Sequence, residues 1–366
     1  MNTNLETIRM FVYSGIACVI GMWWGPYLIR LLNFLKFYKK NLKDTDITGN
    51  KLTVTKGFFE ETDTRVPRAG GILIWLTTLF IAVFFWLLLK ISSEPSNPIA
   101  VFDFLNFVGR KQTVIPLATL VFGSIVGFVD DALSVSDKGG NYVAGGLRLT
   151  QRLLMVVICS LFIGWWFHYK IDFNTLTLPW IGSQGFGLYP IFVGIWIIPI
   201  VIVSLLGLYG SSMIDGFDGL AAGSMIPIFL CYAGIAFSQQ KFELATLIMV
   251  IVGSMVAYLW YNIPPAQFYM GDTGMMGLLL CLGVVAFLTN RIYVLPIAGI
   301  MLVITEASVI IQVLSKKLRG GKKVFKAAPL HHHLEAIGWT RGQITMRYWL
   351  ISMIGSAIAF AIALIG

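Results

Sequence analysis

Charged side chains are scarce in this sequence. Of its 366 residues, 12% are Asp, Glu, Lys or Arg, and 57% are hydrophobic. So few charges cannot cover the surface of a water-soluble globule, which excludes an ordinary soluble domain. Cysteine is also rare, and its four copies lie far apart in apolar runs without a CxxC pair, which excludes a disulfide framework and a cysteine zinc site. We expect these cysteines to be packing residues; they are Cys18, Cys159, Cys231 and Cys281.

Long apolar runs are abundant. About ten of them are roughly 17–25 residues long, enough to cross a hydrocarbon core about 30 Å thick as a helix. The first run lacks an early basic cluster and a small-residue cleavage site, so we expect it to be retained as a span. The sequence predicts an all-α polytopic membrane protein with a single domain, 1–366, and about ten transmembrane helices. The expected spans are 7–33, 68–91, 113–131, 148–169, 189–212, 219–237, 243–262, 275–290, 292–314 and 344–365.

Basic residues indicate the orientation of these spans. Most of the 27 Lys and Arg residues fall in alternate loops or at the adjoining helix ends. The positive-inside rule therefore places these loops in the cytoplasm and both termini outside. The basic excess also suits contact with anionic membrane lipids or with an anionic substrate. The predicted cytoplasmic loops are 34–67, 132–147, 213–218, 263–274 and 315–343.

Aspartates gather on the same predicted side. Asp130 and Asp131 end the third run, and Asp272 lies in MGDTG. Adjacent carboxylates at a membrane boundary are costly without a cation, and oxygen ligands favour a hard ion such as Mg²⁺. The alternative for the first two acids is that they cap a helix or pair with Arg148 or Arg152. The sequence thus predicts one active site, on the cytoplasmic face.

Glycines accompany these acids. In DGFDG, Gly216 and Gly219 leave backbone N–H groups open to a phosphate or a nucleotide. If this stretch is helical, Asp215 and Asp218 share one face of it. Glycines also flank Asp272, which favours a bound ligand there over a packed turn.

Three of the four histidines stand together, as His331, His332 and His333 in PLHHH. The run is short and internal, which argues against an expression tag. Adjacent side chains on a helix splay about 100° apart, so the three rings cannot all converge on one zinc ion. We expect one or two of them to donate a hydrogen bond to phosphate or to shuttle a proton. The alternative is that the rings hold the preceding loop.

With these motifs in place, the sequence resembles the phospho-N-acetylmuramoyl-pentapeptide transferase family. VFKAAPLHHHLEAIGW and ITMRYWLI resemble its C-terminal loop and last helix. VDD, DGFDGLAAG, YNIPPAQFYMGDTG and LPIAGIMLVITEASVIIQV resemble its other motifs, in the same order. The wider superfamily transfers sugar 1-phosphates from UDP-sugars to polyprenyl phosphates. PLHHH followed by GW resembles the muramoyl-pentapeptide branch.

The resemblance implies a magnesium-dependent phosphoglycosyl transferase of the bacterial cytoplasmic (inner) membrane. In this family, undecaprenyl phosphate attacks the β-phosphate of UDP-N-acetylmuramoyl-pentapeptide. The products are lipid I and UMP, and lipid I feeds peptidoglycan synthesis and so cell shape and division. The implied partners are these two substrates, membrane lipids and a second copy of the chain in a homodimer. No nucleic acid partner is implied.

The resemblance also implies roles for single residues. Asp272 would bind Mg²⁺ and share catalysis with Asp130, Asp131 and His331. Asp130 would deprotonate or orient the lipid phosphate. Tyr269 would stack on uracil. The residues implied to bind substrate are Asn262, Asp215, Gly216, Phe217, Asp218, Tyr269, Arg152, His332 and His333.

Several positions depart from the family pattern. TRVPRAGG stands where the family has a lysine followed by TPTMGG, so the replacement would be Arg65 or Arg68. Ser212 replaces a usual Asn, and Thr150 replaces a frequent Arg. Because VPRAGG resembles a related branch, transfer of N-acetylglucosamine 1-phosphate is the nearer alternative function. A transporter that uses Glu306 is the distant one, although the charged motifs lie on one side and no inverted repeat is evident.

Overall fold

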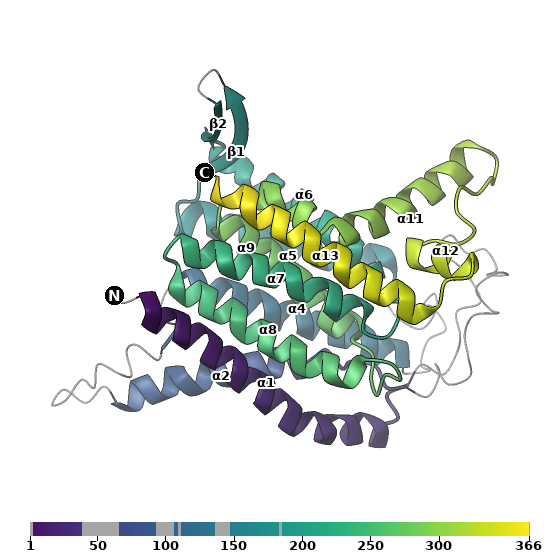
Figure 1. Ribbon diagram of the computed structural model, residues 1–366, viewed down its shortest axis with the longest axis horizontal. Helices are drawn as coiled ribbons and strands as arrows, with labels where there is room; N and C mark the ends of the chain where they lie inside the picture. Colours follow the sequence, from purple (N-terminus) through teal and green to yellow (C-terminus); the bar gives the residue numbers. More distant parts are fainter. Residues whose placement is uncertain are drawn as a thin grey trace.

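The structure, a computed structural model, is mainly a bundle of helices (Figure 1). It describes residues 3–38, 66–92, 106–108, 111–135, 147–182 and 185–365. The helices are α1 (Thr3–Phe34), α2 (Ile72–Ser92), α4 (Lys111–Val135), α5 (Leu149–Lys170), α6 (Ile197–Gly210), α7 (Leu220–Ser238), α8 (Phe242–Asn262), α9 (Gly271–Leu288), α10 (Leu295–Ala298), α11 (Ile300–Leu318), α12 (Leu330–Ala336) and α13 (Arg341–Leu364). The remaining elements are three 3-10 turns, η4 (Gly194–Trp196), η5 (Ser211–Ile214) and η6 (Ile292–Val294), and two strands, β1 (Thr175–Gly182) and β2 (Gly185–Phe192).

The prediction of a helical polytopic membrane protein is confirmed. Among the described residues, eight helices are long and apolar enough to cross a membrane. The bent pair α10–α11 would be a ninth, and α2 contains a shorter apolar stretch, Ile72–Leu88. The predicted count of ten spans stays a prediction. The four cysteines are free thiols, three of them buried, as expected of packing residues.

A β-hairpin replaces the start of one predicted span. Residues 189–192 of the predicted span 189–212 belong to β2, which pairs antiparallel with β1. The spanning segment is Gly194–Ile214. The prediction was wrong here because Pro190 lies in this stretch, where proline removes a helical N–H donor and clashes with the preceding turn. An apolar run can also form a strand of an antiparallel β-hairpin, and the apolar character of the run does not distinguish this from a spanning helix.

The predicted span 292–314 is broken. It contains η6, α10 and α11, and the axes of its two helical parts differ by 79°. The break falls at Gly299, between α10 and α11. Glycine is the weakest helix former after proline, so the chain can turn there at low cost. In Figure 1, α11 leaves the bundle and carries the chain to α12.

The bundle is built around α9, whose spanning window is 94% buried, against 33% for α1 and for α13. Figure 1 shows the hairpin and both termini at one end of the bundle and α12 at the other. We call the latter the α12 end. The helix ends that carry predicted site residues meet there, namely the C-termini of α4 and α8 and the N-termini of α5 and α9.

Small residues let α4 approach α9 closely. A Cβ at Gly127 would overlap the backbone of Asp272, and one at Gly123 would lie 2.9 Å from Gly277 Cα. Such glycine contacts are typical of tightly packed membrane helices. They bring the acidic end of α4 against the first turn of α9.

Candidate functional site

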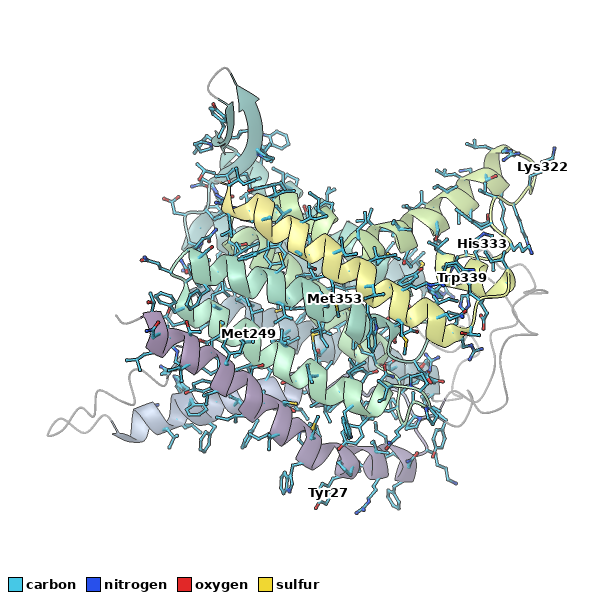
Figure 2. All side chains as sticks on the ribbon, in the orientation of Figure 1. Tyr27, Met249, Lys322, His333, Trp339 and Met353 are labelled. Atoms are coloured by element: carbon cyan, nitrogen blue, oxygen red, sulfur yellow. The ribbon has the colours of Figure 1, made fainter. Side chains whose placement is uncertain are left out.

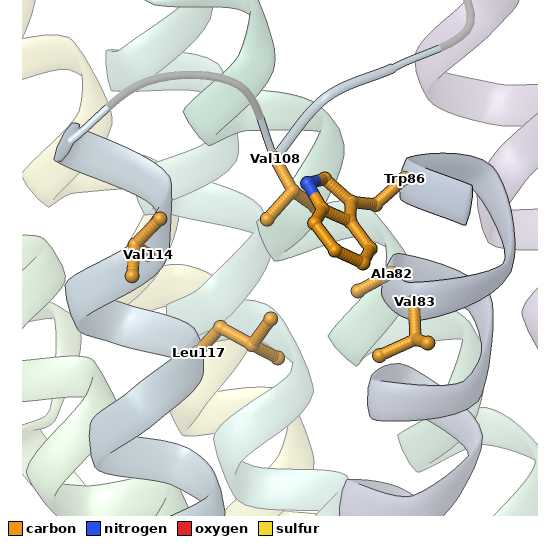
Figure 3. A pocket seen from close by; sticks show the side chains of 6 residues that line it. All are labelled: Ala82, Val83, Trp86, Val108, Val114 and Leu117. Atoms are coloured by element: carbon orange, nitrogen blue, oxygen red, sulfur yellow. The ribbon is translucent and has the colours of Figure 1, made fainter. Parts of the chain in front are cut away.

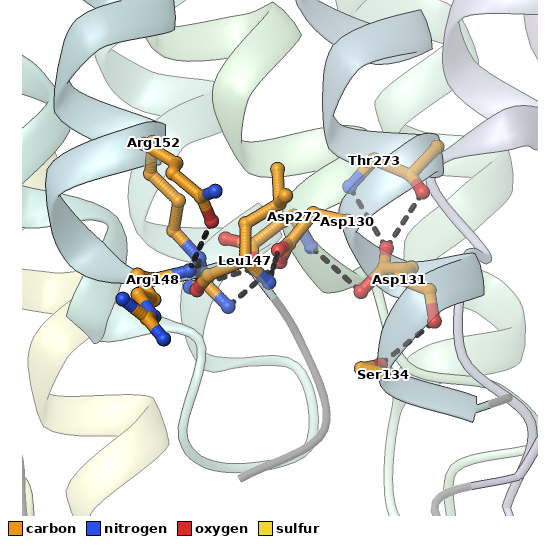
Figure 4. Close-up of polar contacts among 9 residues, drawn as sticks. Asp130, Asp131, Ser134, Leu147, Arg148, Arg152, Asp272 and Thr273 are labelled. Atoms are coloured by element: carbon orange, nitrogen blue, oxygen red, sulfur yellow. Dashed lines mark hydrogen bonds and ion pairs between the residues drawn. The ribbon is translucent and has the colours of Figure 1, made fainter. Parts of the chain in front are cut away.

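Three carboxylates meet at the α12 end of the bundle. Asp130 and Asp131 lie near the C-terminus of α4, and Asp272 lies in the first turn of α9. One oxygen from each lies within 4.8 Å of the others, and Figure 4 shows them side by side. We call these residues the carboxylate triad. The predicted loop 263–274 is wrong at its end, because α9 begins at Gly271 and Asp272 is helical.

Asp131 holds the start of α9. Its Oδ2 accepts hydrogen bonds from Thr273 N (2.9 Å) and Thr273 Oγ1 (2.6 Å), and its Oδ1 accepts one from Asp272 N (3.3 Å). The first N–H groups of a helix have no intrahelical partner and favour a negative charge. Asp131 therefore caps the N-terminus of α9, although it belongs to another helix. Capping of a helix was the alternative to metal binding for the two adjacent acids.

Asp130 and Asp272 share one arginine. Arg152 Nη2 lies 2.7 Å from Asp130 Oδ2, and Nη1 lies 3.1 Å from Asp272 Oδ2. Asp130 Oδ1 also accepts a hydrogen bond from Leu147 N (2.7 Å). Arg152 comes from the first turn of α5 and so bridges α4 and α9 (Figure 4). The alternative in which one of the two adjacent acids pairs with Arg152 therefore holds for Asp130.

The carboxylate triad fits a hard divalent cation. Its donors are all oxygens, and one guanidinium offsets one of the three negative charges. Mg²⁺ usually takes one or two carboxylates and fills its other positions with water and substrate phosphates. Asp130 and Asp272 are the suitable ligands, since each has an oxygen bonded to the flexible Arg152 side chain, whereas both oxygens of Asp131 accept hydrogen bonds from the backbone of α9.

The DGFDG segment forms a turn between η5 and α7. Asp215 Oδ2 accepts a hydrogen bond from Gly271 N (3.1 Å), and Asp218 Oδ2 accepts one from Ala266 N (3.0 Å). These acids therefore do not share a helical face, because the segment is not helical. Gly219 has a φ of +72°, a conformation that favours glycine. The turn is thus joined to the chain that leads into α9.

Asn262 completes this junction. Its Oδ1 accepts a hydrogen bond from Gly219 N (3.0 Å), and its Nδ2 donates one to Phe268 O (2.9 Å).

Burial raises the pKa of Asp215 to about 7, against the opposing effects of the Gly271 N–H and the Arg68 charge. A carboxyl group that titrates near neutrality beside a charged cluster is typical of a functional site.

His331 lies against the DGFDG turn. It is 1% exposed, and a Cβ at Gly216 would overlap its Nε2. The Phe217 ring meets it edge-on at 5.0 Å between centroids. Among the described residues, His331 Nδ1 has no hydrogen-bond partner. Burial and then the neighbouring His332 lower the pKa of His331, so its ring is neutral at pH 7. A neutral ring still offers one N–H donor.

The other two histidines contact different partners. His332 Nδ1 lies 3.3 Å from Glu335 Oε2, and burial lowers the pKa of His332. His333 Nδ1 accepts a hydrogen bond from Lys326 N (3.2 Å) and thereby holds the preceding loop. The His331 and His332 rings lie 4.5 Å apart between centroids and both contact Phe217, whereas His333 is turned toward Lys326 and Phe325, so the three rings do not converge on one point.

Sequence reasoning missed three residues here. Thr273 binds Asp131, and its place after Asp272 at a helix start was a usable signal. Glu335 accepts a 2.8 Å hydrogen bond from Arg341 Nε, and the Arg341 guanidinium lies 5.4 Å from the centroid of the Phe217 ring. No local pattern indicates these two contacts, because they depend on how α12 packs beside α13.

The divergent VPRAGG motif also reaches the site. Tyr269 N donates a hydrogen bond to Pro67 O (2.8 Å), and Gly70 N donates one to Tyr269 O (2.8 Å). Of the two candidate replacements for the family lysine, Arg65 lies outside the described residues. The charge of Arg68 acts on Asp215. Stacking of Tyr269 on uracil stays a prediction.

A separate cavity of about 170 Å³ lies between α2 and α4 (Figure 3). The lining residues that the structure describes are uncharged and therefore offer no charge to bind a diphosphate. Its lining residues are Ala82, Val83, Trp86, Val108, Val114 and Leu117.

Comparisons with known proteins agree with this geometry. Residues 113–290 match the model of glycosyl transferase family 4, and this segment contains the carboxylate triad and the DGFDG turn. The chain is 31% identical to the phospho-N-acetylmuramoyl-pentapeptide-transferase of Listeria innocua, over 98% of both chains. It is 32% identical to the protein of that name from Rickettsia bellii, over 96% of this chain and 94% of the relative. It is 29% identical to the Orientia tsutsugamushi protein of the same name, over 96% of this chain and 93% of the relative.

Proposed function

Because the chain belongs to the phospho-N-acetylmuramoyl-pentapeptide transferase family, we propose that it makes lipid I for peptidoglycan synthesis. It transfers phospho-N-acetylmuramoyl-pentapeptide from the UDP conjugate to undecaprenyl phosphate and releases UMP. The observation that carries this proposal is the carboxylate triad, bridged by Arg152, at the end of a membrane bundle. A site of this kind can hold two phosphorylated substrates where water and lipid meet.

The reaction exchanges one phosphorus–oxygen bond for another. An oxygen of the lipid phosphate attacks the β-phosphorus, and the bond from that phosphorus to the α–β bridging oxygen breaks, so UMP leaves. Catalysis of phosphoryl transfer depends mainly on positioning and charge stabilisation. Arg152, which already touches Asp130 and Asp272, is placed to contact phosphate oxygens.

Asp130 and Asp272 are the proposed Mg²⁺ ligands, with Asp131 holding Asp272 in place through α9. When bound, Mg²⁺ supplies positive charge to the diphosphate. A phosphate monoester has a second pKa near 6, so the lipid phosphate is mostly ionised at pH 7 without an enzyme base. We therefore assign Asp130 the role of orienting the lipid phosphate through its partners, in preference to deprotonating it.

The nucleotide would lie on the DGFDG side of the site. Asp215, Gly216, Phe217 and Asp218 form one turn, and we assign it to uridine together with Asn262. Tyr269 lies in the adjoining chain segment and is the proposed stacking partner of uracil. Neutral His331 is proposed to donate its N–H to a phosphate oxygen, which its burial against Gly216 supports.

The α12 end of the bundle is proposed to face the cytoplasm of a bacterium, in its inner membrane, with both termini outside. The described loop 315–343 supports this, because it contains α12 and is rich in Lys and Arg, and the positive-inside rule places such loops in the cytoplasm. A homodimer also stays a prediction.

The proposal is tested by radiolabel transfer from UDP-N-acetylmuramoyl-pentapeptide to undecaprenyl phosphate by the purified chain. We expect Asp272→Asn to lower turnover by about 10²-fold or more, since it removes charge from the reacting centre. Asp172→Asn is the matched control and should retain turnover, because Asp172 is exposed and bonds to Asn174 beyond the end of α5.

Donor choice separates the alternatives. Lipid-linked product from UDP-N-acetylglucosamine, with none from the muramoyl-pentapeptide donor, would assign the chain to the related branch. Full turnover of Asp272→Asn in chelator would overturn the metal assignment.

A further inference from the structure

The helix α11 has a polar face turned toward the loop that follows it. Its opposite side is apolar and exposed at Val303, Ile310 and Val313. Toward the C-terminus of α11, the buried polar residues are Ser308 (3% exposed), Gln312 (6%) and Ser315 (8%). Because α11 diverges from the bundle, these side chains meet residues 322–330 in place of another long helix (Figure 1).

The Gln312 amide binds the backbone of that loop at three points. Its Oε1 accepts hydrogen bonds from Val324 N and Phe325 N, both at 3.0 Å, and its Nε2 donates one to Phe325 O at 2.8 Å. On either side, Ser315 Oγ donates to Lys322 O (2.9 Å) and Ser308 Oγ accepts from Leu330 N (2.9 Å). We call these three side chains the α11 clamp.

Apart from the α11 clamp, the loop is held mainly by His333, which accepts the hydrogen bond from Lys326 N (3.2 Å) and whose ring lies 5.4 Å from that of Phe325 between centroids. Residues 321–324 and Lys326 are exposed, Phe325 is half-buried, and Ala327 is the buried residue of 321–328. Figure 2 shows Lys322 at the outer corner of this region and His333 below it, nearer the bundle. With so little apolar area removed from water, hydrogen bonds determine where the loop lies. The last clamped residue, Leu330, immediately precedes His331.

We propose that Gln312 is a positioning residue that places His331 against the DGFDG turn by clamping the 322–330 loop to α11. The inference rests on the role proposed above for His331. Loss of the amide would free three backbone groups in an exposed loop, where water can bind them. The fold would therefore persist while His331 became less well placed, and misplacement of about 1 Å can cost about 10²-fold in rate.

The test is a double-mutant cycle on turnover, with Gln312→Leu and His331→Ala. We expect Gln312→Leu alone to lower turnover about 10–100-fold with an unchanged melting temperature. In the His331→Ala background it should cause no further loss. Gln312→Glu keeps both acceptor bonds and should recover part of the activity. In Gln312→Leu, hydrogen exchange should rise at 322–331 and not in α9.

Gln239→Leu is the matched control. Gln239 likewise donates its amide N–H to a backbone carbonyl, Thr289 O (2.8 Å), at the opposite end of the bundle. Turnover of Gln239→Leu should stay within about twofold of the wild-type value, because the substitution is remote from the site. Normal turnover of Gln312→Leu, or an equal further loss without His331, would overturn the inference while the transferase proposal stands. Near-normal turnover of His331→Ala would overturn both the inference and the role proposed for His331.

Discussion

At the scale of single residues, the partners of a side chain decide its role. Asp130 and Asp131 are adjacent in sequence and both nearly fully buried. Asp130 binds Arg152, whereas Asp131 binds the first N–H groups of α9. We therefore expect Asp131 to position the metal ligand Asp272 and Asp130 to lie at the reacting centre. Sequence spacing alone cannot separate two neighbouring carboxylates in this way.

Gly216 allows a direct test at this scale. A Cβ there would overlap His331 Nε2, and buried His331 cannot move aside without leaving its position. We expect Gly216→Ala to lower turnover about 10–100-fold, comparable to other small misplacements of a reacting group. The measurement is kcat in the transfer assay, together with the melting temperature. Gly342→Ala, where an added Cβ meets nothing within 4 Å, should leave turnover unchanged. Equal activity of the two variants would contradict the placement of His331.

At the scale of elements, the site depends on how closely α4 approaches α9. The triad draws its acids from both helices, and glycines at the contact allow the backbones to touch. Arg152 adds α5 to the same junction. The geometry of the carboxylates is therefore set by helix packing more than by any loop.

Gly127→Ala should separate these helices. The added Cβ would overlap the Asp272 backbone, which cannot rotate away as a side chain can. We expect a loss of about 1–3 kcal/mol in the free energy of unfolding, typical of overpacking, with turnover lowered because Asp131 and Asp272 move apart. Thermal unfolding in detergent measures the first effect. Gly207→Ala in α6, which has open space around it, should be neutral or slightly stabilising, since alanine is the better helix former. Equal melting temperatures for the two variants would argue against the close contact.

At the scale of the whole molecule, charge and membrane topology act together. The chain has a formal net charge of +9, yet the acids of the carboxylate triad and of the DGFDG turn lie together at one end of the bundle. Three acids around one guanidinium repel one another, and a divalent cation relieves that repulsion. Bound cation should therefore stabilise the whole fold.

Magnesium should raise the melting temperature of the wild-type chain by a few degrees, since a ligand at 100 times its Kd adds about 2.7 kcal/mol to stability. Asp272→Asn should abolish this increase while keeping or raising the melting temperature in chelator, because it removes one repelling charge. Sodium chloride at matched ionic strength is the control. A magnesium-dependent increase that persists in Asp272→Asn would place the cation elsewhere.

Features that depend on neighbouring residues could be predicted from the sequence alone. A helix in a bilayer satisfies its own backbone hydrogen bonds, so an apolar run of sufficient length predicts a span without knowledge of the rest of the fold. Asp130, Asp131 and Asp272 were likewise identified from residue type and local pattern. Errors occurred where an apolar run had another local solution, as at β2 and at the Gly299 break.

Which side chains contact one another depends on the tertiary structure. Asp131 and Thr273 are 142 positions apart, and no local pattern could show that one caps the helix of the other. The same holds for His331 over Gly216 and for Gln312 against Phe325. A spanning helix results from short-range hydrogen bonds and lipid contact, whereas the division of roles among the acids and histidines results from packing between distant segments.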